Sequence, residues 1–73
     1  MNYAKATTEQ ELLDMVAYLE SKGYKKHNWC LLSIEFYNYP YVGLDYNNEI
    51  YNSKFPELYL QGHEVSVSEF LKQ

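Results

Sequence analysis

The sequence predicts an α+β domain, with one N-terminal helix packed on a three- to four-stranded antiparallel sheet and a short C-terminal helix. Three observations predict it: a capped segment with apolar residues at helical spacing, then segments of period two separated by turn residues, then a second helix-capping pattern. We expect residues 1–73 to form a single domain, because a chain of 73 residues leaves no room for a second core.

The first expected element is a helix over residues 8–22. Either Thr7 or Thr8 can cap this helix, since Thr8 with Glu11 matches the capping-box pattern. Thr7 with Gln10 matches it equally well. In a capping box each side chain bonds the main-chain amide of the other residue. Gly23 ends the helix, because glycine adopts the left-handed conformation at little cost. The apolar stripe that should face the sheet consists of Leu12, Leu13, Met15, Val16, Ala17 and Leu19.

Residues 30–37 alternate with period two and predict the first strand. Pro40 ends it, since proline has no amide proton to donate and holds the preceding residue extended. The side chains expected on its buried face are those of Cys30, Leu32, Ile34 and Phe36.

The second strand is expected over residues 41–46, with Val42, Leu44 and Tyr46 pointing inward. Asn47 and Asn48 indicate a tight turn, because asparagine tolerates positive φ. A third strand then begins at residues 50–51. A three-residue loop would place Ile50 opposite Tyr46 and a two-residue loop would shift the register, so the pairing stays open. The tyrosines assigned to the core are Tyr24, Tyr46 and Tyr59.

The last third predicts a loop, a short strand and a helix. Residues 52–56 read as a loop anchored by Phe55, and residues 58–60 as a short fourth strand closed by Gly62 and His63. Ser66 and Glu69 then form another capping box, which predicts a terminal helical turn over about residues 67–72.

The charge balance argues against a nucleic-acid binder. The formal net charge is −4, and all six basic residues are lysines. Arginine supplies the planar fork that grips phosphate groups and guanine edges, and phosphate neutralisation dominates such affinity. No apolar run is long enough for a membrane span, and the first residues have no signal-peptide core. With a single cysteine as well, the sequence predicts a cytoplasmic protein.

No catalytic or cofactor pattern is present, so we expect neither an enzyme nor a bound cofactor. His27, Cys30 and His63 are the soft metal ligands of the chain, but their spacing matches no zinc site. Cys30 could pair with a histidine as a nucleophile, yet it falls on the predicted buried face, where cysteine acts as a small apolar residue. The sequence therefore predicts no metal site and no catalytic residue.

Tyrosine is the unusual feature, with nine in the chain. Four of them should gather at one outer region of the sheet, close to Glu35. Tyrosine gives a large contact area with a polar tip and is enriched at protein interfaces. The alternative is that these are ordinary strand residues, since tyrosine suits strands. The candidate partner-binding residues in this region are Tyr37, Tyr39, Tyr41, Tyr51 and Glu35.

A second candidate surface lies on the predicted helix, opposite its apolar stripe. Glu11, Asp14 and Tyr18 recur there at helical spacing and form an acidic face with one aromatic ring. Such a face could attract a basic partner. The alternative is an ordinary solvated helix face.

Two segments resemble short phage and prophage accessory proteins. The first comprises residues 8–13 and 18–24, a capped helix followed by Gly23 and Tyr24, and the second comprises residues 62–71. Together they cover about half of the chain and consist of caps and core positions. Small acidic phage proteins of this size include inhibitors of host defence, such as anti-CRISPR proteins. The resemblance implies such a function but transfers no binding residue.

We therefore expect a non-enzymatic protein-binding module, of the phage-inhibitor type, that occludes a host protein such as a nucleic-acid-handling defence complex. Acidic groups would mimic phosphate, and tyrosines would supply contact area. A structural or regulatory homo-oligomer, such as a homodimer, is the first alternative. The second is a weak nucleic-acid binder that uses the lysines of residues 22–27 with Tyr24 and Trp29.

Overall fold

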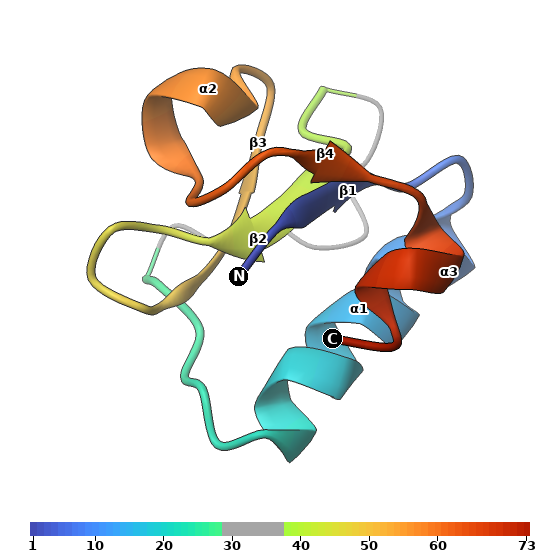
Figure 1. Cartoon of the computed structure of the whole chain (residues 1–73), viewed down its shortest axis with the longest axis horizontal. Coiled ribbons are helices and arrows are strands. Elements are labelled where there is room, and N and C mark those ends of the chain that lie inside the picture. Colours follow the sequence, from blue (N-terminus) through green and yellow to red (C-terminus); the bar gives the residue numbers. More distant parts are fainter. Residues whose placement is uncertain (29–37) are drawn as a thin grey trace.

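A computed structural model of the chain describes residues 1–28 and 38–73. Figure 1 shows a sheet at the centre, with α1 and α3 together on one side of it and α2 on the other. The predicted fold class, α+β, is confirmed. The elements of the described residues are β1 (Tyr3–Lys5), α1 (Glu9–Ser21), β2 (Tyr41–Leu44), β3 (Ile50–Ser53), α2 (Pro56–Tyr59), β4 (Glu64–Val65) and α3 (Val67–Phe70).

The strands of the described residues form one sheet in the order β3-β2-β1-β4. β1 pairs antiparallel with β2 and parallel with β4, so the sheet is mixed rather than purely antiparallel. β1 was not predicted, because three residues are too few to show a period. Residues 30–37, predicted as the first strand, lie outside the described residues.

The predicted N-terminal helix is confirmed as α1. The Thr8 hydroxyl accepts a hydrogen bond from the Glu11 amide at 3.1 Å, as a capping residue should. Gly23 follows the helix with φ +96, the left-handed conformation expected of it. The buried stripe is narrower than predicted, because Leu13 is only half-buried and Ala17 is exposed. The buried residues of α1 are Leu12, Met15, Val16 and Leu19.

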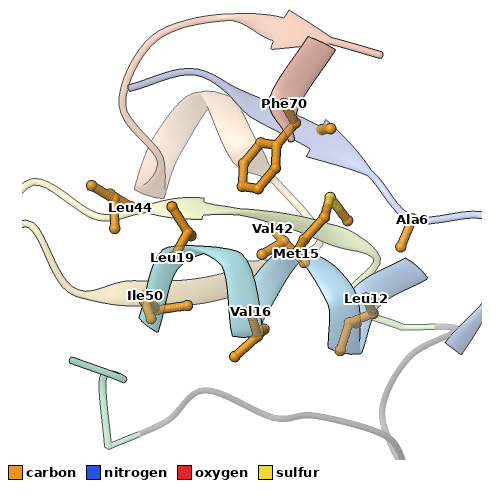
Figure 2. Packing of buried hydrophobic residues seen from close by; sticks show 10 residues of the cluster. Ala6, Leu12, Met15, Val16, Leu19, Val42, Leu44, Ile50 and Phe70 are labelled. Carbon is orange, nitrogen blue, oxygen red and sulfur yellow. The ribbon is translucent and has the colours of Figure 1, made fainter. Parts of the chain in front are cut away.

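The core lies between α1, α3 and one face of the sheet. Figure 2 shows Phe70 of α3 pointing into the same cluster as Met15 and Leu19 of α1. The sheet contributes Ala4, Val42, Leu44 and Ile50 to this cluster, all of them 0% or 1% exposed. Phe70 belongs to the predicted C-terminal helix, which is confirmed as α3. As expected of its cap, the Ser66 hydroxyl accepts a hydrogen bond from the Glu69 amide at 3.1 Å.

The β2–β3 hairpin has neither of the two loop lengths that the sequence left open, and it corrects the predicted position of Tyr46. Val42 and Leu44 are buried as predicted, but Tyr46 is 67% exposed. The strand ends at Leu44, which pairs with Ile50, so residues 45–49 form a connection longer than either alternative. Tyr46 lies in this connection, where the alternation of the strand no longer applies.

Residues 52–60 also differ from the prediction. Asn52 and Ser53 belong to β3 and are buried, while the expected anchor Phe55 is 54% exposed. Residues 58–60 are not a strand, because Pro56 begins the short helix α2. Proline suits the first helical position, since its fixed φ is already helical and the amide proton that it lacks has no partner there.

The tyrosines that were predicted to lie in the core differ in how far they are buried. Tyr24 is half-buried and packs against the core, whereas Tyr59 at the end of α2 is 48% exposed. The assignment of Tyr59 to the core is therefore wrong. It rested on a strand over residues 58–60, and a three-residue apolar run cannot distinguish a strand from a helical turn.

The face of the sheet that points away from α1 is also covered. Tyr3 is 6% exposed and Leu60, which follows α2, is 1% exposed. Both lie against Gly43, where an added β-carbon would be 2.8 Å from Tyr3 Cβ and 3.6 Å from Leu60 Cδ1. Among the described residues, no helix is long and apolar enough to cross a membrane.

Candidate functional site

A hollow of about 380 Å³ lies where three segments meet: residues 25–27, the hairpin connection 45–49, and α2. We call it the tyrosine pocket. Its lining combines three tyrosine rings, an imidazole, one carboxylate, one amide and one leucine. The lining residues are His27, Asp45, Tyr46, Asn47, Tyr51, Leu58 and Tyr59.

The first wall of the pocket consists of residues 25–27, which main-chain hydrogen bonds hold against the edge of the sheet. The Ile50 amide donates to the Lys25 carbonyl at 2.8 Å, and the His27 amide donates to the Ile50 carbonyl at 2.9 Å. These bonds place residues 25–27 parallel to β3. The His27 ring consequently lies beside the Tyr51 ring, with the centroids 5.1 Å apart and the planes at 72°.

The second wall is the turn in the hairpin connection 45–49, which the Asp45 side chain stabilises by accepting hydrogen bonds from main-chain amides. Its Oδ1 atom accepts hydrogen bonds from the amides of Asn47 at 2.8 Å and Glu49 at 3.0 Å. Asn48 completes the turn with φ 61, a conformation that asparagine tolerates. The Asn47-Asn48 signal therefore marked a real turn, although its length was not predicted.

The chain after α2 is tied to this turn. The Gln61 side-chain amide donates to the Asp45 carbonyl at 2.7 Å and to Asn48 Oδ1 at 2.6 Å. The Tyr59 ring in turn contacts the Tyr51 ring, with centroids 6.1 Å apart. The walls are thus joined to one another without any ligand, so the pocket is largely preformed.

The rim of the pocket carries large exposed apolar side chains. Tyr46 is 67%, Leu58 66% and Tyr59 48% exposed, so three of the most exposed large apolar residues among those described surround one hollow. Clustered exposure of this kind marks interaction sites more often than scattered exposure does.

A group of metal-ligating atoms lies at the same place. Ligand atoms of His27, Asp45 and Glu49 are all within 4.8 Å of one another, and all three residues are half-buried. Imidazole and carboxylate groups together can hold a divalent cation. No metal site was expected here, because the spacing of His27 from Cys30 and His63 matches no zinc site and nothing in the sequence brings Asp45 and Glu49 to His27.

Neither Asp45, which lines the pocket, nor Glu49, which lies next to it in this cluster, has a lysine partner. All six lysines of the chain lie in the described ranges, 1–28 and 38–73. The ion pair found there joins Lys26 and Glu20, with Nζ and Oε2 3.9 Å apart. Asp45 and Glu49 thus concentrate negative charge beside the tyrosine rings.

Of the predicted partner-binding residues on the sheet, Tyr51 lines the pocket. Tyr41 is half-buried and packs edge-on against Tyr3, with centroids 6.1 Å apart, and it does not line the pocket. Tyr39 is half-buried, and its carbonyl accepts a hydrogen bond from the Asn52 side chain at 3.1 Å. Glu35 and Tyr37 lie outside the described residues.

The predicted helix residues are engaged within the fold to different degrees. Glu11 Oε1 accepts hydrogen bonds from the Thr7 amide at 2.8 Å and the Thr7 hydroxyl at 2.6 Å. These bonds, the hydroxyl first, lower the pKa of the Glu11 carboxyl. The Tyr18 hydroxyl donates to the Gln73 carbonyl. Asp14 is exposed and accepts from the Gln10 side chain at 2.8 Å.

Sequence reasoning missed most of the pocket. It placed Tyr46 and Tyr59 in the core and gave no role to Asp45 or Leu58. The available signals were the Asn47-Asn48 turn, which exposes its neighbours, and Pro56, which favours a helical turn that presents Leu58 to solvent. Comparisons of the chain with protein-family models, with curated proteins and with solved structures find no match.

Proposed function

We propose that the protein is a non-enzymatic binding module that docks a partner protein at the tyrosine pocket. One observation carries the proposal: Tyr46, Leu58 and Tyr59, between 48% and 67% exposed, surround a single preformed hollow. Tyrosine is enriched at the centres of protein interfaces, where it buries a large area with few rotatable bonds.

The chemistry of the lining supports binding rather than catalysis. The pocket offers an imidazole and a carboxylate, but the described residues that line it include no serine, threonine, cysteine or lysine, the side chains that most often act as nucleophiles. One oxygen of Asp45 already accepts two main-chain hydrogen bonds. This engagement suits a structural carboxylate that also presents its charge to a ligand.

The proposal includes an inhibitor of a host defence or nucleic-acid-handling protein, acting in the cytoplasm by occlusion. The net charge of −4 favours a basic partner surface. Asp45 at the pocket and Asp14 on α1 would supply acidic groups in place of phosphate. The alternative nucleic-acid function is less favoured, because Lys26 pairs with Glu20 and the Lys22 ammonium lies 5.0 Å from the Tyr18 ring centroid.

The proposal is tested by affinity capture from a bacterial lysate with matched variants. Leu58→Ser removes an apolar side chain at the pocket, and Leu71→Ser is its control, because Leu71 is also exposed, at 37%, but lies beyond α3. We expect a protein that the wild type and Leu71→Ser retain and that Leu58→Ser and Tyr46→Ala lose, measured by quantitative mass spectrometry.

Two results would overturn the proposal. The first is that the variants and the wild type capture the same proteins in the same amounts. The second is that the purified wild type is a dimer by light scattering and Leu58→Ser is a monomer. That outcome would assign the exposed surface to a second copy of the chain and favour the homo-oligomer.

A further inference from the structure

We propose that the tyrosine pocket binds an arginine side chain of the partner protein. The inference rests on the proposed function, because it names the chemical group that the docked partner inserts. Three properties of the described residues carry it: two carboxylates without a lysine partner, the exposed rings of Tyr46 and Tyr59 without a lysine ammonium over them, and the size of a preformed hollow.

The charge comes first. Asp45 lines the pocket, and its ligand atom lies within 4.8 Å of those of His27 and Glu49. No lysine of this chain lies within ion-pair distance of either carboxylate, although all six lysines are among the described residues. The chain also contains no arginine. The His27 imidazole lies beside these carboxylates, but a guanidinium group that pairs with them would have to come from another molecule.

The aromatic walls select the kind of cation. A guanidinium group stacks on tyrosine faces and forms two parallel hydrogen bonds with a carboxylate, whereas an ammonium group acts as a hydrated point charge. Elsewhere in this protein rings already attract cations, since Lys22 lies 5.0 Å from the Tyr18 centroid and Lys5 lies 5.8 Å from the Tyr41 centroid. Among the described residues, no lysine ammonium lies over the rings of Tyr46 and Tyr59 in this way.

The size fits one long side chain. A volume of about 380 Å³ lies at the lower end of the range for ligand pockets, about 300–1,000 Å³. Such a hollow takes an arginine side chain and the main chain beside it. Because the Gln61 hydrogen bonds hold the hairpin connection to the segment after α2, little ordering is needed on binding.

A divalent cation held by His27, Asp45 and Glu49 is the rival occupant. The faces of the tyrosine rings would add nothing to its binding, since metal ions in such sites take oxygen and nitrogen ligands. The tyrosine rings around the cluster therefore favour a guanidinium group over a metal ion.

The experiment is a ¹⁵N–¹H NMR titration of the whole chain, in EDTA, with the capped peptide Gly-Gly-Arg-Gly-Gly. The same peptide with citrulline, the neutral isostere of arginine, is the ligand control. We expect saturable shifts at residues 45–47 and 58–59 with the arginine peptide and none with the citrulline peptide. A hydrogen-bonded charge contributes enough that its loss should weaken binding about tenfold.

The protein variant is Asp45→Asn, which keeps an Oδ1 acceptor for the amides of Asn47 and Glu49 and removes the charge. Its matched control is Glu64→Gln, an exposed carboxylate on β4 at the other edge of the sheet. We expect Asp45→Asn to keep the wild-type spectrum and bind the arginine peptide about tenfold more weakly, and Glu64→Gln to bind as the wild type does. Tyr46→Leu, which keeps an apolar group but no ring, should also weaken binding.

Equal binding of the citrulline peptide, shifts that map away from the pocket, or no binding at all would each overturn the inference. So would tight binding of Zn²⁺ to the cluster, in a titration without EDTA, that displaces the arginine peptide. If the peptide fails while Leu58→Ser still abolishes partner capture, the arginine assignment alone is wrong. If both experiments fail, the proposed function is wrong as well.

Discussion

The Tyr18 hydroxyl donates a hydrogen bond to the main-chain carbonyl of Gln73, 55 residues later in the chain. The Tyr18 ring also lies beside Phe70, with centroids 6.1 Å apart. The Gln73 side chain is bound in turn by the Asn2 amide, which donates to its Oε1 atom at 2.8 Å. Tyr18 thus joins α1 to the last residue of the chain, which gives it a structural role. Its role in partner binding stays a prediction.

We expect Tyr18→Phe to lower the free energy of unfolding by about 0.5–1.5 kcal/mol, because the ring stays in place and one hydrogen bond is lost. Urea denaturation followed by circular dichroism measures the change. Tyr46→Phe is the matched control, since Tyr46 is 67% exposed and should unfold as the wild type does. Identical midpoints for Tyr18→Phe and the wild type would contradict the structural role of the hydroxyl.

Gly43→Ala should destabilise the fold by about 1–3 kcal/mol through overpacking, since an added β-carbon would lie 2.8 Å from Tyr3 Cβ. The two strands β1 and β2 would have to separate locally. Chemical denaturation again gives the value. The contrast is Gly23→Asn, because nothing lies within 4 Å of a β-carbon there and asparagine tolerates φ +96 better than most residues. If Gly43→Ala lowers the free energy of unfolding less than Gly23→Asn does, the outer face of the sheet is not packed in this way.

Phe70→Ala should cost about 3–5 kcal/mol, because the ring is 0% exposed in the main core. Since small domains have only about 5–15 kcal/mol in total, this variant could lose most of its stability. Phe70→Leu, a milder change, keeps the test quantitative, and thermal melting of both variants measures it. Leu71→Ala, at an exposed neighbour, serves as the control. A wild-type melting temperature for Phe70→Leu and Phe70→Ala would place α3 away from the core.

The hydrogen bonds from Thr7, first from its hydroxyl and then from its amide, lower the pKa of the Glu11 carboxyl from its ordinary value of 4.5. A carboxyl whose pKa is lower in the folded state adds stability above its unfolded pKa and loses it as the pH falls through the folded pKa. We expect the wild type to lose stability on acidification below about pH 4.5 more steeply than Glu11→Gln does.

Urea midpoints measured between pH 3 and pH 7 test this expectation. Asp14→Asn is the control, because it removes a carboxylate of the same helix that lies outside the capping box. Parallel pH profiles for the wild type and Glu11→Gln would contradict the stabilising role of the ionised Glu11 carboxylate.

The sequence by itself determined the elements whose signals are local. The Thr8 and Ser66 caps bond amides three residues further along the chain, so both helix starts could be predicted from adjacent residues. The apolar spacing of Leu12, Val16 and Leu19 likewise named the buried face of α1. A helix satisfies its own main chain, which is why its pattern can be found without knowledge of the fold.

Only the tertiary structure decided the sheet order and the pocket. β1 is three residues long and gains its place from pairing with β2 and β4, contacts between residues far apart in sequence. His27 meets Asp45 and Tyr51 because residues 25–27 hydrogen-bond to β3. Such pairings depend on which strands become neighbours when the core is buried. A period of two in the sequence predicts which face of a strand is buried but not which strand lies beside it. The site of a small sheet protein therefore becomes visible only once its strands are paired.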